Sequence, residues 1–118
     1  MKYTLEDAGE YGQYYSDNGF WRKVKHVAAQ VGRKVLYPAL QLYYLMQSPA
    51  TPLKDKALII GALGYLILPV DLVPDIIPAL GFTDDLTALM LTLRTLGKDI
   101  TPDIRRQARE QADKLLKP

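Results

Sequence analysis

The sequence has no cysteine and a single histidine, His26, and these absences exclude several classes of protein. Without cysteine there can be no disulfide, no thiol nucleophile and no cysteine-based zinc site. One histidine, two serines (Ser16 and Ser48) and no Gly-x-Ser-x-Gly turn argue against a serine hydrolase. Neither a phosphate-binding glycine loop nor a dinucleotide fingerprint is present. The lack of cysteine agrees with a reducing compartment, and we expect a cytoplasmic protein.

The sequence also has no apolar run that is long enough to cross a membrane. The apolar run of residues 57–70 has 14 residues, whereas a transmembrane helix needs about 20. The N-terminal residues are polar and lack the apolar region of a signal peptide. We therefore expect residues 57–70 to form a core helix. A re-entrant or interfacial hairpin is the alternative, because residues 76–82 and 86–93 add further apolar runs.

The formal net charge of +2 is too small to indicate nucleic acid as a partner. The charges are nevertheless uneven: residues 1–56 carry eight Lys or Arg and five acids, residues 57–97 one and four, and residues 98–118 six and four. Such a layout allows contact between the basic ends and an anionic membrane surface. The simpler interpretation is that charge follows exposure and that the middle segment is buried.

Every strong local signal is helical, and we predict an all-α, single-domain bundle of four to five helices over residues 1–118. Asp17 or Asn18 is expected to cap a helix that starts near Phe20. Its apolar positions recur every three to four residues, at Phe20, Val24, Val27, Val31, Val35, Ala39, Leu42 and Met46. Because Pro38 lies inside this stripe, we expect a kink, or two helices that meet near Tyr37.

A third helix is predicted from the Thr51-Pro52 pair, read as an N-cap followed by proline, to about Ile67. It is apolar on all sides from Ala57 onward, as is typical of the central helix of a bundle or of a membrane-inserted helix. Its small residues, Ala57, Gly61 and Gly64, indicate that another helix packs closely against it. The same small face could instead be buried between subunits of a homo-oligomer.

Pro69 is expected to end the third helix, and Thr83 to cap a fourth that ends near Gly97. The third and fourth helices would form a central apolar hairpin joined by a Pro/Asp-rich connection. A last helix is predicted to start at Thr101-Pro102. Its apolar side comprises Ile104, Ala108, Ala112 and Leu115, and its i,i+4 ion pairs comprise Arg106–Glu110, Arg109–Asp113 and Glu110–Lys114.

The segment from Leu66 to Leu86 combines four aspartates and three prolines with apolar residues. It resembles the signature of the YkvA-like family of small helical proteins, which lack an established activity. The matching residues are Pro69, Asp71, Leu72, Pro74, Asp75, Ile77, Pro78, Gly81, Asp84, Asp85 and Leu86. The resemblance covers about residues 49–93. Leu68 and Thr83 depart from the family pattern, which commonly has a serine and an apolar or aromatic residue there. The resemblance implies a small helical protein, and many proteins with this signature are described as membrane-associated.

The four aspartates, Asp71, Asp75, Asp84 and Asp85, have two interpretations. If the connection is helical and the two helices form a hairpin, the carboxylates could converge and bind Mg²⁺ or Ca²⁺, or share a proton as acid and base. The simpler interpretation, which we prefer, is that prolines set the turns, aspartates cap them and Gly81 supplies an unusual backbone angle.

Aromatic and basic residues crowd the N-terminal third of the chain, and Trp21, Arg22, Lys23 and Lys25 are the candidate contacts for a membrane or a partner. The preferred alternative is that the rings cover the core of the bundle. Two functional hypotheses follow. The first is a non-enzymatic helical module that associates with a membrane surface or a protein partner. The second is a divalent-metal-binding protein or an enzyme that uses the four aspartates.

Overall fold

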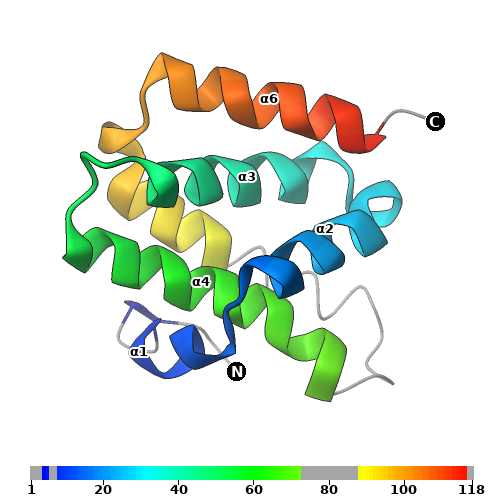
Figure 1. The fold of residues 1–118 in the computed structure, drawn as a ribbon, viewed down its shortest axis with the longest axis horizontal. Helices are drawn as coiled ribbons and strands as arrows, with labels where there is room; N and C mark the ends of the chain where they lie inside the picture. Colours follow the sequence, from blue (N-terminus) through cyan, green and yellow to red (C-terminus); the bar gives the residue numbers. More distant parts are fainter. Residues whose placement is uncertain (1–3, 6–7, 73–87, 117–118) are drawn as a thin grey trace.

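The computed structural model describes residues 4–5, 8–72 and 88–116, and all regular elements in this part of the chain are helical. Figure 1 shows their arrangement. In chain order they are α1 (Ala8–Tyr11), η2 (Gly12–Tyr14), α2 (Asp17–Val31), α3 (Arg33–Gln47), α4 (Leu53–Leu72), a helix over residues 88–96, η3 (Gly97–Asp99) and α6 (Pro102–Leu116). The predicted all-α fold is confirmed.

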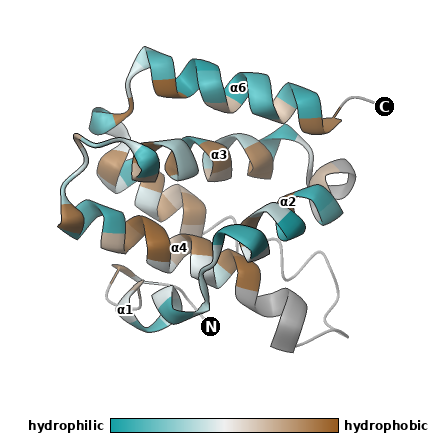
Figure 2. Ribbon diagram, in the orientation of Figure 1, coloured by the Kyte–Doolittle hydropathy of each residue, from teal (hydrophilic) through white to brown (hydrophobic). Residues whose placement is uncertain are grey.

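Helix α4 lies at the centre of the bundle, because its apolar surface is contacted from several sides. It packs against α1, η2, α2 and α3, while α3 also packs against α6. Ile59, Leu63 and Leu66 of α4 are almost completely buried. Figure 2 shows the contrast between the largely apolar α4 and the polar outer surfaces of α2 and α6. This apolar helix is stable here because neighbouring helices cover its buried side chains.

The chain breaks between α2 and α3 at Gly32, and not at Pro38 as expected. Gly32 has φ 63° and ψ −164°, a backbone region that is almost restricted to glycine. Pro38 lies inside α3. A proline in a helix removes one backbone hydrogen bond, and the buried apolar residues around Pro38 hold α3 together across that gap. Of the two predicted alternatives, a kink or two helices that meet near Tyr37, the structure has two helices, and they meet at Gly32 instead.

The cap of α2 is also one residue earlier than predicted. Ser16 is the N-cap, and its Oγ accepts a hydrogen bond from the N–H of Gly19 at 3.0 Å. Asp17, one of the two expected caps, is the first residue of the helix. Its carboxylate accepts hydrogen bonds from the hydroxyls of Tyr15 (2.6 Å) and Tyr43 (3.3 Å). The side chain of Asp17 therefore fastens the start of α2 to α3.

Two expectations about α4 are wrong in detail. The hydroxyl of Thr51 donates a hydrogen bond to the carbonyl oxygen of Leu45 at 2.7 Å, so it ties the end of α3 to the following turn instead of capping α4. Pro69 does not end α4, which continues to Leu72. The loss of one hydrogen bond at a proline weakens a helix without always ending it. Thr83, the expected cap of the next helix, lies outside the described residues.

Of the three small residues of α4, Gly61 and Gly64 are covered within the chain, whereas Ala57 is exposed. A Cβ atom at Gly61 would collide with the backbone and side chain of Ala8, and one at Gly64 would collide with the carbonyl oxygen of Tyr11. The segment α1–η2 therefore lies directly on α4 at a distance that only glycine permits (Figure 1). Tyr11 also packs edge-on against Tyr65 of α4, with ring centroids 4.8 Å apart. The predicted close helix packing is thus supplied by the N-terminal segment.

Helix α6 begins as predicted. The hydroxyl of Thr101 accepts a hydrogen bond from the N–H of Ile104 at 3.2 Å, and Pro102 is the first residue of the helix. Ile104, Ala108 and Ala112 are buried, as the apolar spacing indicates. Arg106 contacts Glu110 at 3.6 Å and Asp103 at 2.5 Å. Asp113, however, pairs with Arg33 of α3 and not with Arg109, so this carboxylate joins two helices.

Candidate functional site

The predicted acidic site is only partly within the described residues. Asp71 belongs to the last turn of α4, whereas Asp75, Asp84 and Asp85 lie outside them, as do Pro74, Pro78 and Gly81 of the sequence signature. Among the residues that the structure describes, no group of three or more His, Asp or Glu side chains is placed to hold a metal ion. A site for Mg²⁺ or Ca²⁺ at the four aspartates therefore stays a prediction.

The aromatic residues of α2 mainly form core contacts. Phe20 is fully buried and stacks on Tyr43 of α3, with ring centroids 4.8 Å apart and an interplanar angle of 5°. The half-buried Trp21 packs edge-on against the same tyrosine at 5.0 Å. Burial, followed by the hydrogen bond to Asp17, raises the pKa of Tyr15 well above its ordinary value. These rings fasten α2 to α3, which is the arrangement preferred in the sequence analysis.

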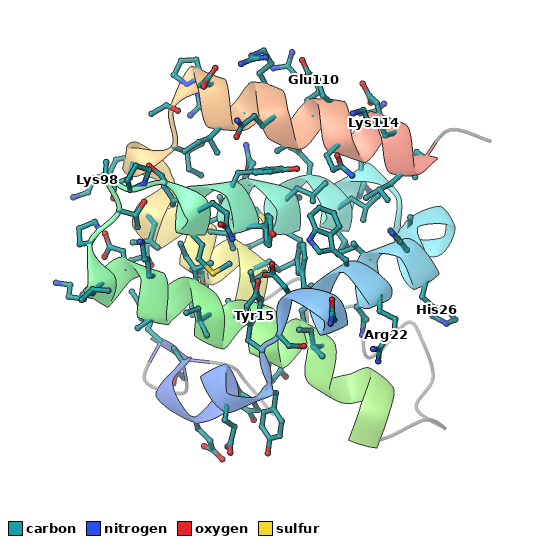
Figure 3. The ribbon with its side chains drawn as sticks, viewed as in Figure 1. Tyr15, Arg22, His26, Lys98, Glu110 and Lys114 are labelled. Carbon is teal, nitrogen blue, oxygen red and sulfur yellow. The ribbon has the colours of Figure 1, made fainter. Side chains whose placement is uncertain are left out.

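The basic residues of α2 divide into buried and exposed groups. Lys23 is 5% exposed, so it does not lie on the outer surface of α2. Arg22 and Lys25 are exposed, and Figure 3 shows Arg22 and His26 pointing away from the bundle on the same side of the helix. Of the four predicted contact residues, Arg22 and Lys25 are therefore presented to solvent, and Trp21 is partly covered.

Further basic residues gather where α2 turns into α3. Arg33, Lys34 and Tyr37 of α3 and Arg109 of α6 line a pocket of about 390 Å³. Arg33 and Arg109 are 76 residues apart in the chain, and the antiparallel packing of α3 and α6 brings them together (Figure 1). Sequence spacing does not connect Arg109 with Arg33 and Lys34, because an i,i+4 pairing with Asp113 explains the position of Arg109 locally.

We name the exposed basic residues around this end of the molecule the elbow surface: Arg22, Lys25, Arg33, Lys34, Arg109 and Lys114. Of the nearby acids, Asp113 pairs with Arg33, a member of this surface, and Glu110 pairs with Arg106, which lies outside it. In Figure 3, Arg22 on α2 and Lys114 on α6 lie on opposite outer sides of the bundle, and both are far from Lys98 at the other end. The elbow surface thus draws exposed positive charge from three helices, and Arg33, Lys34 and Arg109 are the members that share a pocket.

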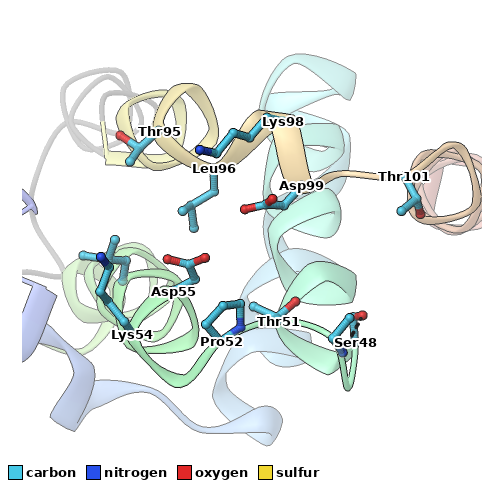
Figure 4. Close-up of a pocket in the computed structure, with 12 residues that line it drawn as sticks. Ser48, Thr51, Pro52, Lys54, Asp55, Thr95, Leu96, Lys98, Asp99 and Thr101 are labelled. Atoms are coloured by element: carbon cyan, nitrogen blue, oxygen red, sulfur yellow. Dashed lines mark hydrogen bonds between the residues drawn. The ribbon is translucent and has the colours of Figure 1, made fainter.

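A second pocket, of about 710 Å³, lies at the opposite end of the molecule. It is lined by the turn before α4, the first turns of α4 and residues 95–101. Figure 4 shows Leu96 and Asp99 on one wall and Asp55 on the opposite wall. Lys54 and Lys98 also line it, so the charges of its walls balance. Balanced charge gives this pocket no preference for an anion or a cation.

Comparison with known proteins shows what the centre of the chain is similar to. Residues 55–91 match the profile of a family described as "Protein of unknown function (DUF1232)". A stretch of 53 residues is 34% identical to the "Uncharacterized membrane protein YkvA" of Bacillus subtilis (strain 168), and it covers 45% of this chain and 50% of that protein. The chain contains a YkvA-like segment. The resemblance inferred from the Pro/Asp signature is thereby confirmed.

The chain spans about half the length of the curated relative that it matches. No solved structure matches the chain. The family segment comprises most of α4 and the start of the helix over residues 88–96, whereas the elbow surface lies in α2, α3 and α6. Among the described residues, no helix combines the length and the apolar character that are needed to cross a bilayer.

Proposed function

We propose that the protein is a non-enzymatic helical module that associates with an anionic membrane surface through the elbow surface. The supporting observation is that the exposed basic side chains of the elbow surface come from three helices, and that three of them, Arg33, Lys34 and Arg109, share one pocket. Each basic side chain close to an anionic surface contributes about 1 kcal/mol of attraction. The matched relative is named a membrane protein, which supports association with a membrane.

The opposite end of the molecule provides an internal comparison. There Lys54 and Lys98 share a pocket with Asp55 and Asp99, so the local charge is balanced. A surface of balanced charge has little net attraction for anionic lipid. Binding should therefore depend on which lysines and arginines are removed, and not only on how many.

The proposal is tested by co-sedimentation with vesicles of phosphatidylglycerol and phosphatidylcholine at low salt. The variant Arg22→Ser/Lys25→Ser removes two exposed charges from the elbow surface. The matched control, Lys54→Ser/Lys98→Ser, removes two charges from the balanced end. We expect the first variant to lose about tenfold or more in vesicle affinity and the control to lose less than about twofold.

Binding should also weaken as salt rises, because exposed charges are screened over about 10 Å at 0.1 M salt. If the wild-type protein does not bind phosphatidylglycerol vesicles at low salt, association with lipid is rejected and a protein partner becomes the leading alternative. If both variants lose affinity equally, the binding reflects net charge alone and the elbow surface is not its site.

A further inference from the structure

We infer that the pocket formed by Arg33, Lys34, Tyr37 and Arg109 binds the phosphate of an anionic phospholipid headgroup. This inference rests on the proposed function and assigns it a specific ligand site. The pocket volume of about 390 Å³ is within the range of small-molecule sites, roughly 300–1,000 Å³. Its walls come from two helices that pack firmly against each other, α3 and α6.

Positive charge surrounds a pocket whose wall is mostly apolar. Three cationic residues line it mainly through the carbon atoms of their side chains, and the carboxylate joined to them is that of Asp113, which pairs with Arg33. Lys34 and Arg109 form no ion pair with any residue that the structure describes. Three cations and one carboxylate leave a local charge of +2. A phosphate group held between Lys34 and Arg109 would offset that charge.

The position of Arg33 and Lys34 adds to this imbalance. Both lie in the first turn of α3, which contains no acidic residue and has no side-chain cap. Cations at the start of a helix are repelled by the partial positive charge of the helix dipole. The sequence therefore collects positive charge where the helix alone disfavours it, and a bound anion would relieve the repulsion from both sources.

The shape of the lining favours a lipid headgroup over free phosphate. The ring of Tyr37 is half-buried and packs against the core, so one wall is a fixed aromatic surface. The aliphatic stems of lysine and arginine can cover apolar parts of a ligand while their charged ends reach a phosphate. A headgroup offers both a phosphate and a glycerol backbone with its acyl esters, whereas inorganic phosphate offers only the charge. The pocket also belongs to the elbow surface, where the proposed membrane contact takes place.

The test uses the full chain and a soluble lipid, dihexanoyl phosphatidylglycerol below its micelle concentration. Binding is followed by NMR amide shifts in titrations with this lipid and, separately, with inorganic phosphate. The variant Lys34→Gln/Arg109→Gln removes the two cations that have no ion pair. The matched control, Arg105→Gln/Lys98→Gln, removes one exposed arginine from α6 and one lysine from the opposite end. Circular dichroism verifies that both variants fold.

The inference predicts that the wild-type protein binds the short-chain lipid, with changes in the NMR amide shifts of residues around Tyr37. The pocket variant should lose about tenfold or more in affinity for this lipid, and the control should lose less than about twofold. Equal binding of inorganic phosphate and lipid would overturn the assignment to a headgroup. Wild-type protein that binds phosphatidylglycerol vesicles but not the short-chain lipid would overturn the pocket while leaving the proposed function intact. Absence of vesicle binding would reject the proposed function itself.

Discussion

At the scale of single residues, three hydroxyl side chains that precede helices have different partners. Ser16 and Thr101 accept hydrogen bonds from the first turns of α2 and α6. Thr51 precedes α4, yet its hydroxyl donates to Leu45 at the end of α3. Thr51 is buried beside that carbonyl group, whereas Ser16 and Thr101 are exposed. Residue type thus indicates where a helix starts, but the backbone groups that the fold brings near the hydroxyl decide which hydrogen bond forms.

Replacement of Ser16 tests the cap of α2. Ser16→Ala should lower the free energy of unfolding by about 1 kcal/mol, because it removes the acceptor for the N–H of Gly19. Asn18→Ala is the matched control, since Asn18 is exposed and lies within the helix. It should change stability by less than about 0.5 kcal/mol. Urea denaturation measures the free energy of unfolding of both variants. A larger loss of stability in Asn18→Ala than in Ser16→Ala would contradict the assignment of Ser16 as the cap.

The raised pKa of Tyr15 predicts a dependence on alkaline pH. Because the folded chain holds this proton more tightly than the unfolded chain, the stability it contributes is fully present below about pH 10. That stability is lost as the pH rises toward the folded pKa. Urea denaturation at pH 8 and pH 11 measures the free energy of unfolding of wild type and of Tyr15→Phe. The difference between these two free energies should be smaller at pH 11 than at pH 8. A constant difference would mean that Tyr15 has an ordinary pKa.

At the scale of elements, the junction of α2 and α3 is determined by one glycine. Gly32 is the residue with a positive φ among the described residues, and an added Cβ would meet no neighbouring atom within 4 Å. The requirement for glycine is therefore a matter of backbone conformation and not of space. The apolar stripe runs past Gly32 on both sides, so periodicity alone could not locate the break.

Gly32→Ala should cost about 1–3 kcal/mol of stability, the usual cost of holding a side-chain-bearing residue in this backbone region. Pro38→Ala is the informative comparison, because it restores a backbone donor inside α3. Pro38→Ala should change the stability of the protein by less than Gly32→Ala does. Thermal unfolding followed by circular dichroism measures both, and a greater loss for Pro38→Ala would indicate that the proline shapes the junction.

At the scale of the whole molecule, the N-terminal segment completes the bundle by covering the small-residue side of α4. Ala8 and Tyr11 are buried against Ala62 and Tyr65, in a cluster separate from the main core. The contact depends on the absence of side chains at Gly61 and Gly64. The two glycines of the face that suggested a subunit interface are therefore covered by the chain itself, whereas Ala57 of that face is exposed.

Gly64→Ala tests this closure. The new methyl group would collide with the carbonyl oxygen of Tyr11, and the resulting displacement of the N-terminal segment should cost about 1–3 kcal/mol. Gly9→Ala adds the same methyl group in α1, where it meets no atom within 4 Å, and should be neutral or slightly stabilising. Denaturation curves compare the two. If Gly64→Ala is as stable as wild type, the segment does not pack closely on α4.

The sequence by itself determined the helical class, the central position of α4, the start of α6 and the YkvA-like segment. These follow from local spacing, capping residues and composition, which act within a few residues of each other. Only the tertiary structure decided that α1 fills the glycine face, that Lys23 is buried and that Arg109 joins Arg33 and Lys34. The physical reason is that these contacts join residues far apart in the chain, so their partners are chosen by helix packing and not by the neighbouring sequence.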